Sequence, residues 1–185
     1  MNNQNHLNEP PKKLRDLFFS SFVFFVATMA FGGVTVTYEE VGGTVVFTAS
    51  GSINTGDLTE TANTATGAFV SPNAGLLQSN GAFLWSAAGF SGPSSFGTAG
   101  FTSGTSTGNT FGVREPGSFA GGGINLPSGY VSGTPISGTL TVTGSIASLG
   151  LLPTVTYTWG TGPNADFFTI RDVSVPVELV SFSVE

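Results

Sequence analysis

The feature that most constrains the fold is the stretch 129–173, where three short runs of β-branched and aromatic residues are separated by Gly, Pro and Asn. The runs are Thr139–Ile146, Thr154–Trp159 and Phe167–Val173. Runs of this length, bounded by turn-forming residues, are typical of β-strands joined by tight turns. The clearest helical pattern after the N-terminal segment is a single turn at Ile146–Leu151. We therefore predict an all-β chain.

The same pattern recurs on both sides of this stretch. Val34, Val36 and Tyr38 alternate with hydroxyl and acidic residues, which turns one face of a strand inward. Further strands are predicted at Thr44–Ile53, Leu58–Thr61, Ala68–Val70, Ala82–Ala87 and Val175–Val184. Short strands with Gly-rich turns predict an antiparallel β-sandwich, of jelly-roll or immunoglobulin-like type. A short β-solenoid is the alternative, but no fixed period of roughly 20 to 50 residues supports it.

Segment 88–123 is dominated by Gly, Ser and Thr, and five phenylalanines punctuate it. Such tracts can be flexible linkers, but each aromatic ring can anchor a loop to a core. We therefore predict an ordered, loop-rich region. Ser71–Gly81 and Gly121–Tyr130 are predicted as turns. The five anchors are Phe90, Phe96, Phe101, Phe111 and Phe119.

Residues 1–30 have the pattern of a signal peptide. Lys12, Lys13 and Arg15 precede the apolar run Leu17–Phe31, and small residues allow cleavage after Ala30. The run is shorter than the ~20 apolar residues that span a bilayer, although an uncleaved anchor is the alternative. We predict a signal helix at 1–30, one β-sandwich domain at 31–185, and a location outside the cell or on its surface.

Charge and residue usage exclude several functions. Charged residues are only 9% of the chain, and from residue 31 onward two arginines stand against nine acidic residues, a net charge of −7. Such a surface cannot neutralise a run of phosphates, so we expect no nucleic-acid binding, and no membrane binding after leader cleavage. Cysteine is absent, and His6 and both lysines lie in the leader. Most catalytic and metal-binding side chains are thereby missing, and we predict a non-enzymatic protein without metal or cofactor.

Several phrases in the second half resemble the ectodomains of bacterial exported proteins that carry a PEP-CTERM sorting tail. Segment 45–58 and the phrase at 92–97 resemble the earlier part of such domains. The resemblance implies an exported surface or extracellular-matrix protein, and it carries no enzymatic activity with it. The phrases in the second half are Pro127–Tyr130, Ser132–Gly133, Ala147–Leu151, Tyr157–Gly160, Asn164–Asp166 and Phe167–Ile170.

The resemblance does not extend to a sorting tail. The Pro-Glu-Pro motif, transmembrane helix and basic cluster of that tail do not follow residue 173. The last residues, 175–185, resemble instead the linker that precedes the sorting tail of type IX-secreted proteins. Release of the protein and a missing end of the sequence both remain open, as does its mode of retention at a surface.

Two kinds of polar site can be considered from the sequence. Asn164 and Asp166 offer oxygen atoms for Ca²⁺, but a calcium ion needs about six to eight such ligands, and an Asx turn is the simpler interpretation. Acidic residues could pair for glycoside hydrolysis, but nothing in the sequence brings them together, so we interpret them as solvated charges. These acids are Glu39, Glu40, Asp57 and Glu60.

Three aromatic residues, Trp85, Tyr130 and Trp159, could form a surface on which sugar rings stack, although burial in the core is the simpler interpretation. The leading hypothesis is a non-enzymatic exported surface or matrix protein whose partners are polysaccharides or other surface proteins. A carbohydrate-binding module and a subunit that self-assembles through exposed edge strands are the alternatives.

Overall fold

The computed structural model describes residues 32–63, 67–81, 83–117 and 122–173. The predicted signal segment 1–30 and the predicted last strand Val175–Val184 lie outside the described residues. Within the four described ranges, no helix is both long enough and apolar enough to cross a membrane.

The described residues form twelve strands and three short helical turns. The turns are η1 (Pro72–Ala74), α1 (Ile146–Leu149) and η2 (Gly162–Asn164). The strands are β1 (Val34–Val41), β2 (Thr44–Ser52), β3 (Thr59–Asn63), β4 (Ala68–Ser71), β5 (Leu76–Gln78), β6 (Phe83–Ser86), β7 (Thr102–Gly108), β8 (Gly112–Arg114), β9 (Gly123–Leu126), β10 (Pro135–Thr143), β11 (Thr154–Trp159) and β12 (Asp166–Asp172).

All twelve strands belong to one hydrogen-bonded sheet, in the order β11-β12-β1-β2-β10-β7-β4-β5-β8-β9-β6-β3. The all-β prediction is confirmed. The predicted division into two antiparallel sheets is not, because the ladder is continuous and β1 pairs with β12 in parallel. These two strands are the first and the last along the described chain, and no hairpin joins them. No short connection therefore forces them to be antiparallel.

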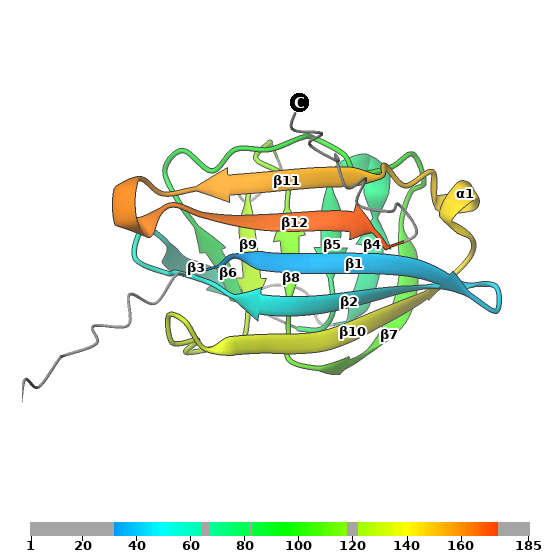
Figure 1. Ribbon diagram of the computed structural model, residues 1–185, viewed down its shortest axis with the longest axis horizontal. Coiled ribbons are helices and arrows are strands. Elements are labelled where there is room, and N and C mark those ends of the chain that lie inside the picture. Colours follow the sequence, from blue (N-terminus) through cyan, green and yellow to red (C-terminus); the bar gives the residue numbers. More distant parts are fainter. Residues whose placement is uncertain (1–31, 64–66, 82, 118–121, 174–185) are drawn as a thin grey trace, which may run out of the picture.

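The sheet curls so that its two halves face each other. In Figure 1, β11, β12, β1, β2 and β10 form one layer in front of β4, β5, β8 and β9. The turn between the halves is made by β7, which pairs with β10 on one side and with β4 on the other. Both halves contribute to one apolar core, which includes Tyr38 and Phe47 from the front and Leu77, Val113 and Ile124 from the rear.

The clearest predicted strands formed because their apolar residues alternate. Val34, Val36 and Tyr38 are buried in β1, and Val45, Phe47 and Ala49 are buried in β2. Strand β11 follows the same rule, with buried residues at 155, 157 and 159 between exposed threonines. The single helical turn was also predicted correctly as α1, which Ser145 and Ser148 cap reciprocally.

Four strands lie where turns or loops were expected. Strand β5 falls within 71–81, β9 within 121–130, and both β7 and β8 within 88–123. Strand β7 contains only Thr, Ser and Gly, so its sequence carries no apolar alternation. It is held instead by pairing with the long strand β10, since every residue from 104 to 108 is in register with β10.

The predicted aromatic anchors have different outcomes. Phe90, Phe96 and Phe111 are buried in the core, as expected. Phe101 is 69% exposed and lies against Phe69, with ring centroids 5.0 Å apart, so that prediction was wrong. Phe119 lies outside the described residues.

The outer edge of β11 is partly covered by the segment that follows Phe90. Ser91 and Thr158 exchange backbone hydrogen bonds of 2.9 and 2.8 Å, and the Leu152 N–H donates to the Phe96 carbonyl at 2.9 Å. These contacts protect an edge strand that could otherwise pair with another chain. They count against β11 as the edge for self-assembly.

Candidate functional site

The outer face of the front layer is covered by hydroxyl groups. Alternation places the apolar residues of β10, β2, β1, β12 and β11 inside and leaves Thr and Ser at most outward positions. The outward residues of β7 continue this surface. The hydroxyl residues are Thr35, Thr37, Thr44, Thr48, Ser50, Ser52, Ser103, Thr105, Thr107, Ser137, Thr139, Thr141, Thr143, Thr154, Thr156, Thr158 and Thr169.

Register brings these side chains into rows across neighbouring strands. The hydroxyls of Thr107 and Thr139 are 2.8 Å apart, and those of Thr156 and Thr169 are 2.9 Å apart. Residues directly opposite one another on paired strands point to the same side of the sheet. The result is a surface of paired hydroxyl and methyl groups, on which β7 and β10 carry no charged residue at all.

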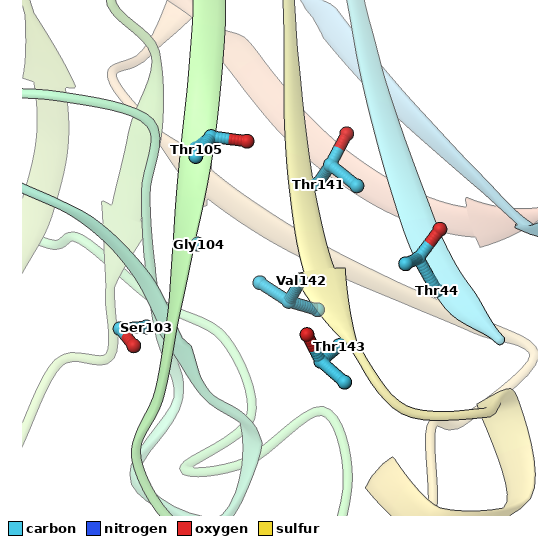
Figure 2. A pocket seen from close by; sticks show the side chains of 7 residues that line it. All are labelled: Thr44, Ser103, Gly104, Thr105, Thr141, Val142 and Thr143. Atoms are coloured by element: carbon cyan, nitrogen blue, oxygen red, sulfur yellow. The ribbon is translucent and has the colours of Figure 1, made fainter.

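A hollow of about 350 Å³ opens in this face where β7 separates from β10. Figure 2 shows Ser103, Gly104 and Thr105 along β7 on one side, and Thr141, Val142 and Thr143 along β10 on the other. Thr44 of β2 stands beyond β10, and the hydroxyl of Thr105 is directed toward β10. Five hydroxyl-bearing residues from three strands therefore line one depression.

The position of the hollow follows from the pairing of β7. Its ladder with β10 ends at Gly104, opposite Val142, while on its other side β7 pairs with β4 from Gly104 to Thr102. Thr143 is thus left without a residue of β7 opposite it, and the strands diverge. Glycine is required at 104, because a Cβ there would clash with the carbonyl oxygen of Thr141 and lie 2.8 Å from Cγ1 of Val142.

Hydroxyl groups both donate and accept hydrogen bonds, and their methyl neighbours in threonine present small apolar surfaces. A surface of this kind suits an uncharged, hydroxyl-rich partner better than an ion, because it offers no full charge to pair with one. The arrangement contains neither an acid–base pair nor a nucleophile activated by a base.

Asn164 and Asp166, the predicted calcium candidates, are directed to different partners. The Asp166 carboxylate is buried and accepts from the backbone N–H of Asn54 at 2.6 Å and of Phe167 at 2.8 Å. The Asn164 side-chain amide donates to Asp57 at 2.8 Å. These contacts attach segment 54–57 to the turn between β11 and β12. Both carboxylate oxygens of Asp166 accept hydrogen bonds from the backbone.

Burial is the main influence on Asp166 and raises the pKa of its carboxyl group, while the backbone N–H donors act in the opposite direction. Among the described residues, no three His, Cys, Asp or Glu side chains gather in a way that could hold a metal ion.

Two of the acidic residues considered for glycoside hydrolysis, Asp57 and Glu40, accept hydrogen bonds from other segments of the domain. The carboxylate of Asp57 accepts from the Thr161 N–H at 3.1 Å as well as from Asn164. Glu40 accepts from the Ile146 N–H at 2.9 Å, at the start of α1. Glu60 lies on β3, at the far edge of the sheet from β11 and β12.

The three aromatic candidates do not form one surface. Trp159 is buried in the core, stacked on Phe90, and its indole N–H points to the Asn54 carbonyl at 3.5 Å. Trp85 is partly buried on β6 and packs against the core. Tyr130 is buried and is one of the residues that line a second hollow, and its hydroxyl donates to the Thr134 carbonyl and accepts from the Ile53 N–H at 3.0 Å.

The hydroxyl hollow was not identified from the sequence. A signal existed in the alternating threonines at 139, 141 and 143 and at 105 and 107. Alternation in a sequence, however, indicates only which side of each strand is apolar. Comparison with protein-family models, curated proteins and solved structures finds no match to this chain.

Proposed function

We propose that this chain is an exported, non-enzymatic surface or matrix protein that binds neutral polysaccharide through the hydroxyl-lined hollow between β7 and β10. The observation that carries the proposal is the grouping of Thr44, Ser103, Thr105, Thr141 and Thr143 around one uncharged depression. Polysaccharides present hydroxyl groups at a density that such a surface can match with reciprocal hydrogen bonds.

The remaining expectations fit this proposal. The leader-like segment 1–30 supports export, and the resemblance of the second half to PEP-CTERM ectodomains supports a place at the cell surface or in a matrix. The scarcity of general bases and nucleophiles after residue 31 supports binding rather than catalysis. For the fold, assignment to a two-layer sandwich of jelly-roll or immunoglobulin-like type is also a proposal, supported by the single core that the two facing halves enclose.

The test is retention of the purified protein on insoluble β-glucan, xylan and mannan, with a polyuronate as the charged comparison. We expect retention on at least one neutral polymer and none on the polyuronate, because the domain is itself acidic. Replacing Thr105 and Thr141 together by Val removes two hydroxyls of the hollow and keeps the side-chain shape. This double variant should bind at least about tenfold more weakly, which corresponds to about 1.4 kcal/mol.

The matched control is Thr37→Val with Thr48→Val, a pair on β1 and β2 that faces outward but does not line the hollow. It should bind as the unaltered protein does. Equal loss in both double variants would place the binding elsewhere on the face. Absence of retention on every neutral polymer would overturn the proposed function.

A further inference from the structure

Two surface hollows lie at opposite ends of the same pair of strands. The hydroxyl hollow borders β7 at 103–105 and β10 at 141–143. A second hollow, of about 270 Å³, borders the residue after β7, Asn109, and the beginning of β10, Pro135 and Ile136. Because β7 and β10 are antiparallel, with Gly138 opposite Gly108 and Val142 opposite Gly104, the two hollows are connected by one ladder.

The strip between the hollows continues the chemistry of the first. Its outward side chains include Thr107 and Thr139, with hydroxyls 2.8 Å apart, and Ser137. At one end of the strip the strands approach closely, and only glycine fits at 138, because a Cβ there would lie 2.5 Å from the Asn109 carbonyl oxygen. Gly138 itself is buried, and the outward side chains of the strip, Thr107, Ser137 and Thr139, are small and uncharged.

The second hollow adds an apolar surface to these hydroxyls. Tyr130, with 9% of its surface exposed, lines it together with Pro127, Pro135 and Ile136, and Val131 lines it with 69% of its surface exposed. Both hydrogen bonds of the Tyr130 hydroxyl are made with the backbone, and they fix the position of the side chain. An apolar lining of this kind suits the apolar face of a sugar ring.

We propose that an extended, unbranched neutral polysaccharide chain lies along the β7–β10 pair, with hydrogen bonds in the hydroxyl hollow and a sugar ring against the apolar lining of the second hollow, which Val131 and Pro135 expose. This inference rests on the proposed function and adds the path of the ligand. A strand rises about 3.3 Å per residue, so the distance from Ile136 to Thr143 is about 23 Å, and several sugar units fit along it. Neither strand carries a charged residue, so the path offers a charged chain no opposite charge with which to pair.

The path predicts a dependence on chain length that a single hollow would not give. The experiment is titration calorimetry of the purified protein with fragments of the neutral polymer that retains it, beginning with unbranched β-glucan fragments of increasing length. Affinity should rise with length until the chain covers about 23 Å, since successive contacts act as linked sites, and should then level off.

Val131→Asp tests the second hollow separately. It places a carboxylate at the border of the hollow on an exposed side chain, so folding should be unaffected. Long fragments should bind at least about tenfold more weakly, and the shortest should bind as before. Leu152→Asp is the matched control, because Leu152 is also exposed, at 44%, and lines neither hollow.

The outcomes separate this inference from the proposed function. Loss of long-fragment affinity in Val131→Asp but not in Leu152→Asp supports the path. Binding of all lengths by Val131→Asp as by the unaltered protein, with binding lost on removal of the Thr105 and Thr141 hydroxyls, overturns the path and leaves the proposed function intact. Absence of binding by the unaltered protein at every length overturns both.

Discussion

Phe90 connects the Gly- and Ser-rich segment to the front layer through two aromatic contacts. Its ring stacks on Tyr157 and Trp159, with centroid distances of 6.1 and 5.9 Å. Only 8% of Phe90 is exposed. Replacing it by Ala should lower the free energy of unfolding by about 3–5 kcal/mol, because the change removes a buried ring and leaves a cavity. Urea unfolding followed by circular dichroism measures this loss.

Phe101→Ala is the matched control for Phe90→Ala, since Phe101 is a phenylalanine of the same segment and is exposed. Phe101→Ala should change the free energy of unfolding by less than about 1 kcal/mol. Comparable losses in both variants would contradict the assignment of Phe90 as an anchor. The sequence could not separate the two residues, because each is a single aromatic among Gly, Ser and Thr, and only the packed structure distinguishes an inward ring from an outward one.

At the scale of the element, β7 depends on the absence of a side chain at position 104. A Cβ there would clash with the Thr141 carbonyl oxygen on β10. Gly104→Ala should therefore lower the free energy of unfolding by about 1–3 kcal/mol, the usual cost of overpacking, and should disturb the hydroxyl hollow beside it. Thermal unfolding of the variant and the polysaccharide retention assay measure the two effects.

Gly100→Ala is the control for this element, because a Cβ at 100 meets no atom within 4 Å. Its free energy of unfolding should be unchanged or higher by less than about 1 kcal/mol, since alanine restricts the unfolded chain. Equal destabilisation by both substitutions would mean that the loss of glycine flexibility, and not the contact with β10, is responsible.

An element could be predicted from the sequence where its apolar residues follow a regular spacing. Strands β1, β2 and β11 could be predicted because their apolar residues alternate with hydroxyl residues. The capped turn α1 could be predicted because its apolar residues are spaced as in a helix and do not alternate. Strand β7 could not, since its inward positions are Thr, Gly and Ser. The hollow was missed for a related reason: its residues come from three strands that are distant in sequence, and only their register brings them together.

At the scale of the whole molecule, the single sheet could not be predicted from local patterns. Alternation identifies which side of a strand faces inward, but it does not specify the neighbour of that strand. The parallel pairing of β1 with β12 and the passage of β7 from β10 to β4 are both contacts between distant segments. The enclosure of one core by both halves of the sheet places all three tyrosines of the chain in buried positions.

This shared burial predicts how the molecule responds to alkali. Burial raises the pKa of Tyr38 to about 12, with a smaller contribution from the charge of Asp172. Burial also raises the pKa of Tyr130 and of Tyr157. Because the folded state holds these protons more tightly than the unfolded chain, whose tyrosines titrate near pH 10, their stabilising contribution is complete below about pH 10 and is lost as the pH rises toward about 12.

Phenolate absorbance and circular dichroism, followed together from neutral to alkaline pH, measure this response. Both signals should change in one transition above pH 10, since the tyrosines ionise as the sheet opens. Tyr38→Phe should start from a lower stability at neutral pH, because the Leu152 carbonyl loses the hydrogen bond of 2.7 Å that it accepts from the Tyr38 hydroxyl. The same variant should then lose less of its free energy of unfolding between about pH 10 and 12 than the unaltered protein does. Ionisation of all three tyrosines near pH 10 in a chain that stays folded would contradict their common burial, and with it the single core that the curled sheet encloses.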